Sequence, residues 1–315
     1  MSHQQASAEF GVIVTCSHRD LWMAKGCCAS VRHFMPDVPL CLLFDGAREQ
    51  AASLARTYDA LVLCRDNVES EFLRERSFGY GVTKMIAFWE SPFDSFLLID
   101  ADTVVIGDMR EHANFAASDI IVNGPRQYRP DQVERGFFNT QRLLEAFPGA
   151  TWDERQVFNS GVIFARKDVF RLEDYEQLLD AAGQFPDLFK AGDQGMLNFL
   201  VIRDQSKKQL RFAQAKLQVI VGYAASGELE NAIGMSNGDV VSRSGRAIVL
   251  HYAGVRPYTS NRHPYTQPMT HFRKMYRNDY FKQQKRRAAS LRTEEFFTRH
   301  PKMKKTLHLL LGDRC

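Results

Sequence analysis

Short apolar runs alternate with longer amphipathic segments in the first part of the chain. The runs at residues 10–15, 40–44 and 60–64 are rich in Val, Leu and Cys, which predicts buried strands. The segment ending near Phe34 and residues 47–58 lie between them and predict helices. Strands and helices that alternate at these lengths are typical of βαβ units, so we expect a sheet covered by helices on both faces.

The pattern continues less regularly along the rest of the chain. We expect helices at residues 83–89, 172–182 and 193–201, and strands at residues 96–99, 120–122, 161–165 and 247–250. Residues 222–245 are rich in Gly, Ser and Asn, which predicts a loop. Ser17 and Asp20 have the spacing of a capping box, so the first helix is expected to begin there. These elements together predict an α/β fold with one Rossmann-like mixed sheet.

Charge is distributed unevenly over a chain whose composition is otherwise ordinary. The 315 residues are 44% hydrophobic and 25% charged, which argues against a disordered, collagenous or disulfide-framework protein. The net charge of +4 combines 27 basic and 33 acidic residues in 1–260 with 14 basic and 4 acidic residues in 261–315. We therefore divide the chain into a polar N-terminal extension (1–9), a body (10–260) and a basic, aromatic C-terminal helical tail (261–315).

The apolar runs and the N-terminal residues lead us to expect neither a membrane span nor a signal peptide in this sequence. No run reaches the roughly 18 apolar residues that a membrane span needs, and the N-terminal residues do not have the pattern of a signal peptide. Five of the six cysteines lie in apolar segments and none forms a C-x-x-C pair. Buried free thiols are typical of a reducing compartment, so we expect a cytoplasmic protein.

The strongest chemical signal is Asp100-Ala101-Asp102, which follows the apolar run FLLI. Ligands of open α/β sheets bind beyond the carboxyl ends of strands, and two carboxylates there suit Mg²⁺ or Mn²⁺. His251 also follows a predicted strand, and an imidazole as third ligand favours Mn²⁺. Considered separately, the acidic pair also fits a solvated turn and His251 a hydrogen-bonded core histidine.

Two weaker motifs carry groups that bind hydroxyls. Asn159, Ser160 and Gly161 enter a predicted strand, and Asp193 and Gln194 open a predicted helix. Their amides and carboxylates suit sugar hydroxyls, and a helix start offers free N–H groups to an oxyanion. Each motif separately also fits a common local structure, a turn for the first and an N-cap for the second.

In this order, the motifs resemble those of the glycogenin-like family of retaining glycosyltransferases, family 8 enzymes of the GT-A fold. The resemblance covers residues 10–260 and rests on these blocks: Val14-Thr15-Cys16, Thr83-Lys84-Met85, the Asp-x-Asp pair, FNSGV (158–162), GDQGMLN (192–198) and HYAG (251–254). It implies transfer of a hexose, glucose or galactose, from a UDP-sugar with retention at the anomeric carbon. The acceptor would be a hydroxyl of a glycan, glycolipid or protein.

The resemblance also implies a role for each matching residue. Asp100, Asp102 and His251 would ligate Mn²⁺, with Mg²⁺ as the alternative. The donor would be bound by Thr15, Lys84, Asp100, Ala101, Asp102, Asn159, Ser160, Gly161, Gly254 and Arg256, and Asp193 and Gln194 would be catalytic. The family ends its histidine block in Lys-Pro-Trp after two residues, whereas here Val255 alone separates Gly254 from Arg256. Both a covalent intermediate and front-face attack remain open as routes to retention.

Other interpretations remain for the body and the tail. FLLIDADTVV also fits the first motif of haloacid-dehalogenase-like phosphatases, with Asp100 as nucleophile, and a non-catalytic sugar-nucleotide-binding protein is a third interpretation. The tail resembles the basic, aromatic C-terminal region of bacterial lipooligosaccharide galactosyltransferases, which favours peripheral contact with the inner face of a membrane through 261–315. The alternative is a helical tail with one apolar stripe packed on the body; nucleic acid is not an expected partner.

Overall fold

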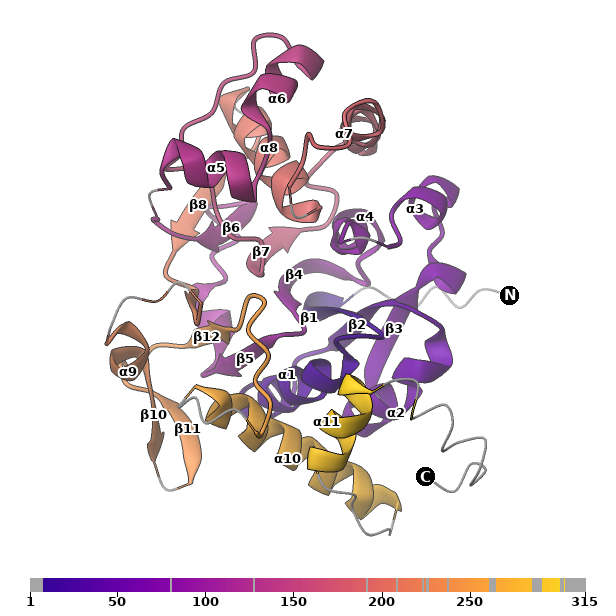
Figure 1. The fold of residues 1–315 in the computed structure, drawn as a ribbon, viewed down its shortest axis with the longest axis vertical. Helices are drawn as coiled ribbons and strands as arrows, with labels where there is room; N and C mark the ends of the chain where they lie inside the picture. The colour runs from indigo at the N-terminus through magenta and orange to yellow at the C-terminus, as the bar shows by residue number, and fades with distance from the viewer. Residues whose placement is uncertain are drawn as a thin grey trace.

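A mixed seven-stranded sheet forms the centre of the molecule in the computed structural model (Figure 1). The structure describes residues 8–300 and 303, apart from 80, 127, 191, 208, 223, 225, 226, 237, 261–264 and 285–290. The strands are β1 (Ala8–Ser17), β2 (Leu40–Asp45), β3 (Ala60–Cys64), β4 (Phe93–Asp100), β5 (Thr103–Ile106), β6 (Ile120–Asn123), β7 (Val162–Arg166), β8 (Phe212–Ala215), β9 (Gln218–Ile220), β10 (Ile233–Ser236), β11 (Asp239–Ser242) and β12 (Ile248–His251). Seven of these strands form the central sheet, in the order β3-β2-β1-β4-β7-β6-β8.

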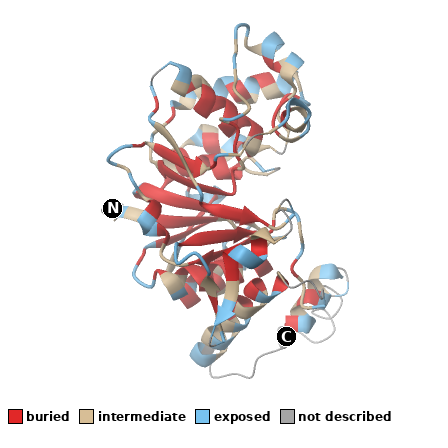
Figure 2. Ribbon diagram, turned by 90° about the vertical axis from the view of Figure 1, so that its left-hand side faces the viewer, coloured by how far each residue is buried: buried red, intermediate tan, exposed pale blue. Residues whose placement is uncertain are grey.

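Helices cover both faces of this sheet, as the sequence predicts. They are α1 (Leu21–Phe34), α2 (Arg48–Tyr58), α3 (Glu71–Arg76), α4 (Ala87–Glu90), α5 (Pro130–Gly136), α6 (Thr140–Ala146), α7 (Leu172–Gln184), α8 (Asp193–Ser206), α9 (Glu228–Ala232), α10 (Thr266–Gln284) and α11 (Leu291–Arg299). Side chains of β1 alternate between the faces, so Val12 and Val14 join one core with α1 and α10, while Ile13 joins the other with α7 and α8. Figure 2 shows the buried sheet strands between the partly exposed helices.

The sheet is parallel on one side and mixed on the other. β1 pairs in parallel with β2 and β4, whereas β7 is antiparallel to both β4 and β6. Thr15 pairs with Asp100 in the register of β1 and β4, so the carboxyl ends of these neighbouring strands meet at one edge. The expected α/β class with a Rossmann-like mixed sheet covered by helices is confirmed, and smaller sheets lie beside it.

A second, three-stranded sheet brings distant residues to the same edge. β12 pairs antiparallel with β5 and parallel with β9. The register places His251 opposite Thr103, directly after the Asp100–Asp102 segment. The backbone N–H of Tyr252 also donates to the carbonyl of Asp102 at 2.9 Å. The pairing of β5 with β12 therefore brings the predicted histidine to the predicted acidic pair.

Two predictions about local structure are wrong. The first helix begins at Leu21, and Ser17 donates its hydroxyl hydrogen to the Asp20 carboxylate at 3.0 Å, which removes the expected capping box. Residues 222–245 contain α9 and the β10–β11 hairpin instead of a loop. The hairpin is held from outside, because Asp239 lies 2.7 Å from His33 Nε2 on α1. This tertiary contact is invisible in the local composition.

The described part of the basic tail is helical and packs on the body. α10 lies along α1 (Figure 1), and its Met269, Phe272 and Tyr276 are buried in the same core as α1. This arrangement agrees with the alternative that the sequence analysis gave for the tail, a helix with one apolar stripe packed on the body. Residues 1–7 and the LHLLL run (307–311) lie outside the described residues. Within the described residues, every helix is too short or too polar to span a membrane.

The contact of α10 with α1 predicts an unequal effect of the same substitution at two helical glycines. A Cβ at Gly26 would lie 2.5 Å from Sδ of Met269, so Gly26→Ala should lower the free energy of unfolding by about 1–3 kcal/mol through overpacking. A Cβ at Gly183 on α7 meets nothing within 4 Å, so Gly183→Ala should be neutral or stabilising. Urea denaturation measures both; equal effects would contradict this packing.

Candidate functional site

The predicted acidic pair lies where β4 turns into β5. The N–H of Asp100 donates to the carbonyl of Gly161 at 3.1 Å, and the N–H of Ala101 donates to the carbonyl of Thr15 at 3.0 Å. These bonds attach the Asp100–Asp102 turn to β1 on one side and to the start of β7 on the other. Backbone hydrogen bonds at one edge of the sheet therefore connect Thr15, the acidic pair and Gly161, which the sequence places in three separate motifs.

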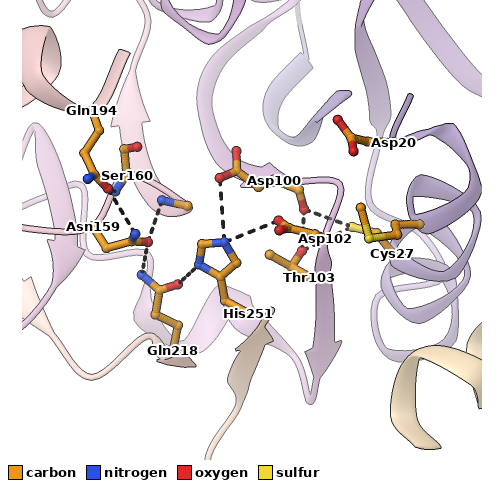
Figure 3. Close-up of polar contacts among 12 residues, drawn as sticks. Asp20, Cys27, Asp100, Asp102, Thr103, Asn159, Ser160, Gln194, Gln218 and His251 are labelled. Atoms are coloured by element: carbon orange, nitrogen blue, oxygen red, sulfur yellow. Dashed lines mark hydrogen bonds and ion pairs between the residues drawn. The ribbon is translucent and has the colours of Figure 1, made fainter. Parts of the chain in front are cut away.

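Among the described residues, Asp100, Asp102 and His251 form a group whose ligand atoms lie within 4.8 Å of one another (Figure 3). His251 Nε2 lies 3.3 Å from a carboxylate oxygen of Asp102 and 3.8 Å from one of Asp100. Burial would lower the pKa of His251, but the two carboxylates raise it above its usual value. Two hard oxygen donors and one imidazole suit a divalent cation such as Mn²⁺.

The orientation of the His251 ring is set by Gln218, which the sequence analysis missed. Gln218 Oε1 accepts a hydrogen bond from His251 Nδ1 at 2.8 Å, which leaves Nε2 facing the two aspartates. The imidazole also packs directly on Gly161, where a Cβ would lie 2.2 Å from the ring. A lone glutamine at the start of β9 gives no recognisable sequence motif, so only the pairing of β9 with β12 reveals it.

A chain of side-chain amides extends from Gln218 to the start of α8 (Figure 3). Gln218 Nε2 donates to Asn159 Oδ1 at 3.1 Å, and Asn159 Nδ2 donates to Gln194 Oε1 at 3.0 Å. Gln194 Nε2 in turn donates to the carbonyl of Gly136 at 3.0 Å. The histidine and the predicted catalytic glutamine therefore belong to one hydrogen-bonded chain.

Lys84 places a buried positive charge between two acidic residues. Its Nζ lies 2.6 Å from Asp100 Oδ1, 3.2 Å from Asp193 Oδ2 and 3.0 Å from the carbonyl of Ser160. Burial would lower the pKa of Lys84, but the two carboxylates raise it well above its usual value, so the ammonium stays charged. Burial raises the pKa of Asp193, which also accepts a hydrogen bond from Ser160 Oγ at 2.9 Å.

A cleft of about 720 Å³ opens at this edge of the sheet. Its lining consists of Thr15, Cys16, Ser17, His18, Arg19, Asp20, Asp45, Gly79, Gly81, Thr83, Lys84, Asp100, Ala101, Asp102, Asp193, Gly254 and Arg256. Asn159, Ser160, Gly161, Gln194 and His251 are outside this lining and connect to it through the hydrogen bonds above. Thr15 Oγ1 is buried and has no hydrogen-bond partner among the residues that the structure describes, which fits a cleft that holds a polar ligand.

Gly254 and Arg256 lie on the cleft wall that follows β12. The N–H of Gly254 helps His251 to hold the pKa of Asp102 below its usual value, against the effect of burial. Arg256 donates to Asp20 Oδ1 at 2.9 Å, although the sequence predicts a contact with donor phosphates. The guanidinium is half exposed, and its place on the cleft wall keeps the phosphate role a prediction.

Comparison with known proteins reveals the fold through structure alone, since no family model and no curated protein matches the sequence. The galactosyltransferase LgtC, solved with donor and acceptor sugar analogues, matches with a TM-score of 0.55 and 14% identity over 84% of this chain and 95% of its own. The bifunctional glycosyltransferase WbbM matches with a TM-score of 0.56 and 13% identity over 87% of this chain and 50% of its own.

The glycosyltransferase GlyE of Streptococcus pneumoniae TIGR4 gives a similar result, with a TM-score of 0.55 and 13% identity over 90% of this chain and 66% of its own. These proteins are glycosyltransferases of the GT-A fold, and the present chain has that fold. The fold that the sequence resemblance implies is thereby confirmed.

Removing the buried ammonium group of Lys84 should destabilise the protein in the absence of metal. Lys84→Met leaves the Asp100 and Asp193 carboxylates facing each other without it, so we expect the free energy of unfolding to fall by about 3 kcal/mol. The double variant Lys84→Met/Asp193→Asn removes one of these charges and should recover at least half of the loss. Urea denaturation at pH 7 without metal measures both variants. Additive losses would show that the two residues are not coupled.

Proposed function

We propose that this protein is a Mn²⁺-dependent glycosyltransferase that moves a hexose, glucose or galactose, from a UDP-sugar to an acceptor hydroxyl with retention. The observation that carries the proposal is the grouping of Asp100, Asp102 and His251 beside a polar cleft at the carboxyl ends of β1 and β4. The GT-A fold supports it, since LgtC shares the fold and was solved with donor and acceptor sugar analogues. The partnerless Thr15 hydroxyl suits contact with the nucleoside.

The cleft supplies positive charge where a diphosphate leaving group needs it. A divalent cation held by the Asp100–Asp102–His251 group would supply Lewis-acid stabilisation of the departing diphosphate. Lys84 adds a fixed ammonium next to Asp100, and Arg256 adds a guanidinium on the cleft wall. Charges already in place need no reorganisation when negative charge develops on the leaving group.

We assign the reacting centre to the start of α8. Asp193 is buried, lines the cleft and is oriented by Lys84 and Ser160, so its remaining acceptor capacity suits a donor hydroxyl. Gln194 is held at both ends of its amide by Asn159 and Gly136, which suits a group that stabilises positive charge on the sugar ring. Both a covalent intermediate and front-face attack are compatible with these assignments.

The acceptor enters, in this proposal, beside Gln218. A second cavity of about 390 Å³ is lined by Asn123, Gly124, Lys216, Gln218 and the start of α9, among others. Gln218 forms its wall and contacts His251 directly, so the cavity lies next to the candidate metal group. Its polar lining suits the hydroxyls of a glycan, a glycolipid or a glycosylated protein.

A nucleotide-sugar assay tests the proposed reaction. The protein is incubated with a panel of UDP-sugars, with Mn²⁺ or with a chelator, and release of UDP is measured. We expect Mn²⁺-dependent turnover of one UDP-hexose and a loss of at least about 100-fold in Asp102→Ala, because even residues that only support metal ligands cost 10- to 100-fold.

The matched control is Asp180→Ala, which removes an exposed carboxylate on α7 and should retain activity. Release of phosphate from p-nitrophenyl phosphate without turnover of any UDP-sugar would favour the phosphatase interpretation of Asp100. Binding of UDP-sugars without turnover would favour the non-catalytic interpretation.

We also propose peripheral contact of the tail with an anionic membrane on the cytoplasmic side. Lys274, Lys282 and Arg292 are exposed on α10 and α11, while the apolar stripe of α10 faces the body. Basic side chains near an anionic surface contribute about 1 kcal/mol each, so these three together contribute about 3 kcal/mol to the proposed binding.

Liposome co-sedimentation tests this contact. Reversing the three charges (Lys274→Glu, Lys282→Glu, Arg292→Glu) should weaken sedimentation with phosphatidylserine vesicles by at least tenfold, and binding to neutral vesicles should be weak throughout. A control with three exposed charges reversed outside the tail (Arg135→Glu, Arg171→Glu, Lys207→Glu) should bind like the wild type. Equal loss in the two triple variants would show that net charge alone is responsible.

A further inference from the structure

The segment that forms one wall of the cleft also touches the C-terminal helix α11. Residues 252–260 follow His251, carry Gly254 and Arg256, and lead toward α10. Gly254 has a φ of 88°, a left-handed conformation that glycine adopts without strain. The position of this wall depends on contacts further along the segment, since a glycine restrains the backbone least.

Glu295 of α11 holds the segment through two hydrogen bonds. The backbone N–H of Thr259 donates to its carboxylate at 2.9 Å, and the Thr259 hydroxyl donates to it at 2.5 Å. Glu295 is only 4% exposed, although α11 lies at the surface. A buried carboxylate bonded to a loop gives that loop one defined position, because the acceptor is costly to leave unpaired.

Glu295 is itself held by Arg273 of α10, which contacts Trp22 of the body. Arg273 Nη1 lies 2.6 Å from Glu295, its Nη2 lies 2.7 Å from Glu294, and its guanidinium stacks 4.6 Å from the ring of Trp22. Glu294 also forms an ion pair with Lys25 of α1. Two acidic residues of α11 are therefore paired with buried or half-buried cations of α1 and α10.

Arg299 makes a second attachment on the same segment. Its guanidinium lies 4.0 Å from the centre of the Tyr258 ring, and its Nη2 donates to Ser260 Oγ at 2.8 Å. The Tyr258 ring is also held by α1, because it stacks on Trp22 with ring centroids 4.9 Å apart. Tyr258, Thr259 and Ser260 are thus held by two residues of α11 and one of α1.

We infer that α11 is a latch that fixes residues 254–260, of which Gly254 and Arg256 line the cleft, and thereby sets the affinity for the nucleotide donor. Glu295 and Arg299 are positioning residues in this inference, since they act through the segment that carries Gly254 and Arg256. The inference rests on the proposed function and gives the acidic and basic residues of α11 a role at the donor site. In this inference, donor affinity depends on a helix that begins about 40 residues after Gly254 in the chain.

The test weakens the latch without removing buried charge. Thr259→Val removes the hydroxyl bond to Glu295 at nearly constant volume, and Arg299→Met removes the cation above Tyr258. The matched control is Arg292→Met, the same substitution at an exposed arginine of the same helix. Three readouts are compared: amide hydrogen exchange of residues 253–260 without metal or nucleotide, the Kd for UDP in the presence of Mn²⁺, and the midpoint of urea denaturation.

We expect the double variant Thr259→Val/Arg299→Met to exchange at least about tenfold faster over residues 253–260, since two of the contacts that hold the segment are removed. The Kd for UDP should rise about three- to tenfold relative to Arg292→Met, and the denaturation midpoint should fall by no more than the loss of these contacts accounts for. A purely structural role would shift the midpoint and leave the Kd of the folded protein unchanged.

Two results would overturn the inference. Unchanged exchange over residues 253–260 would show that α11 does not hold the segment. Faster exchange with an unchanged Kd for UDP would show that the latch does not act on the donor site. If the wild-type protein binds no UDP, the proposed function and the donor half of the inference fail together, and the exchange rates then decide the structural half.

Discussion

The buried ammonium group of Lys84 is the interaction on which the carboxyl edge of the sheet depends. Asp100, Asp102 and Asp193 converge there from β4, the following turn and the start of α8, and like charges at these distances repel strongly where water is excluded. Lys84 lies between two of them, and His251 faces the third. The edge can therefore keep several carboxylates together without unfolding, which a site for a divalent cation and a diphosphate requires.

The sequence predicted seven of the twelve strands that the structure describes, and the position of the acidic pair after one of them, because both depend on local chemistry. Apolar runs bounded by polar residues mark buried strands, and the pair directly after FLLI indicates the edge where ligands bind. The errors occur where a distant contact outweighs local preference. Ser17 bonds to Asp20 instead of capping the helix, and the hairpin within 222–245 is attached to α1 through Asp239 and His33 and buries Ile233 and Val240 in the core. The sequence analysis missed Gln218 for the same reason, because its hydrogen bond with His251 forms only when β9 pairs with β12.

The structure changes the meaning of the charge in the tail. A net charge of +10 over residues 261–315 suggests an exposed basic surface, yet Arg273 is almost fully buried and paired with two glutamates of the same tail. Part of the charge is therefore internal and connects α10 and α11 to each other and, through Lys25, to α1. Among the described residues of the tail, the exposed Lys274, Lys282 and Arg292 are charges that remain available for the proposed membrane contact.

The amide chain from His251 to Gln194 shows why these residues act as one unit. Each amide in the chain both donates and accepts, so rotating any of them breaks two hydrogen bonds at once. His251, the proposed cation ligand, and Gln194, which we assign to the reacting centre, are thereby held together across β12, β9, the turn before β7 and α8. Preorganisation of this kind is effective because the polar groups are already oriented when charge develops, and little free energy is needed to reorient them. The weak sequence motifs gain their chemical meaning from this shared geometry, which no single motif contains.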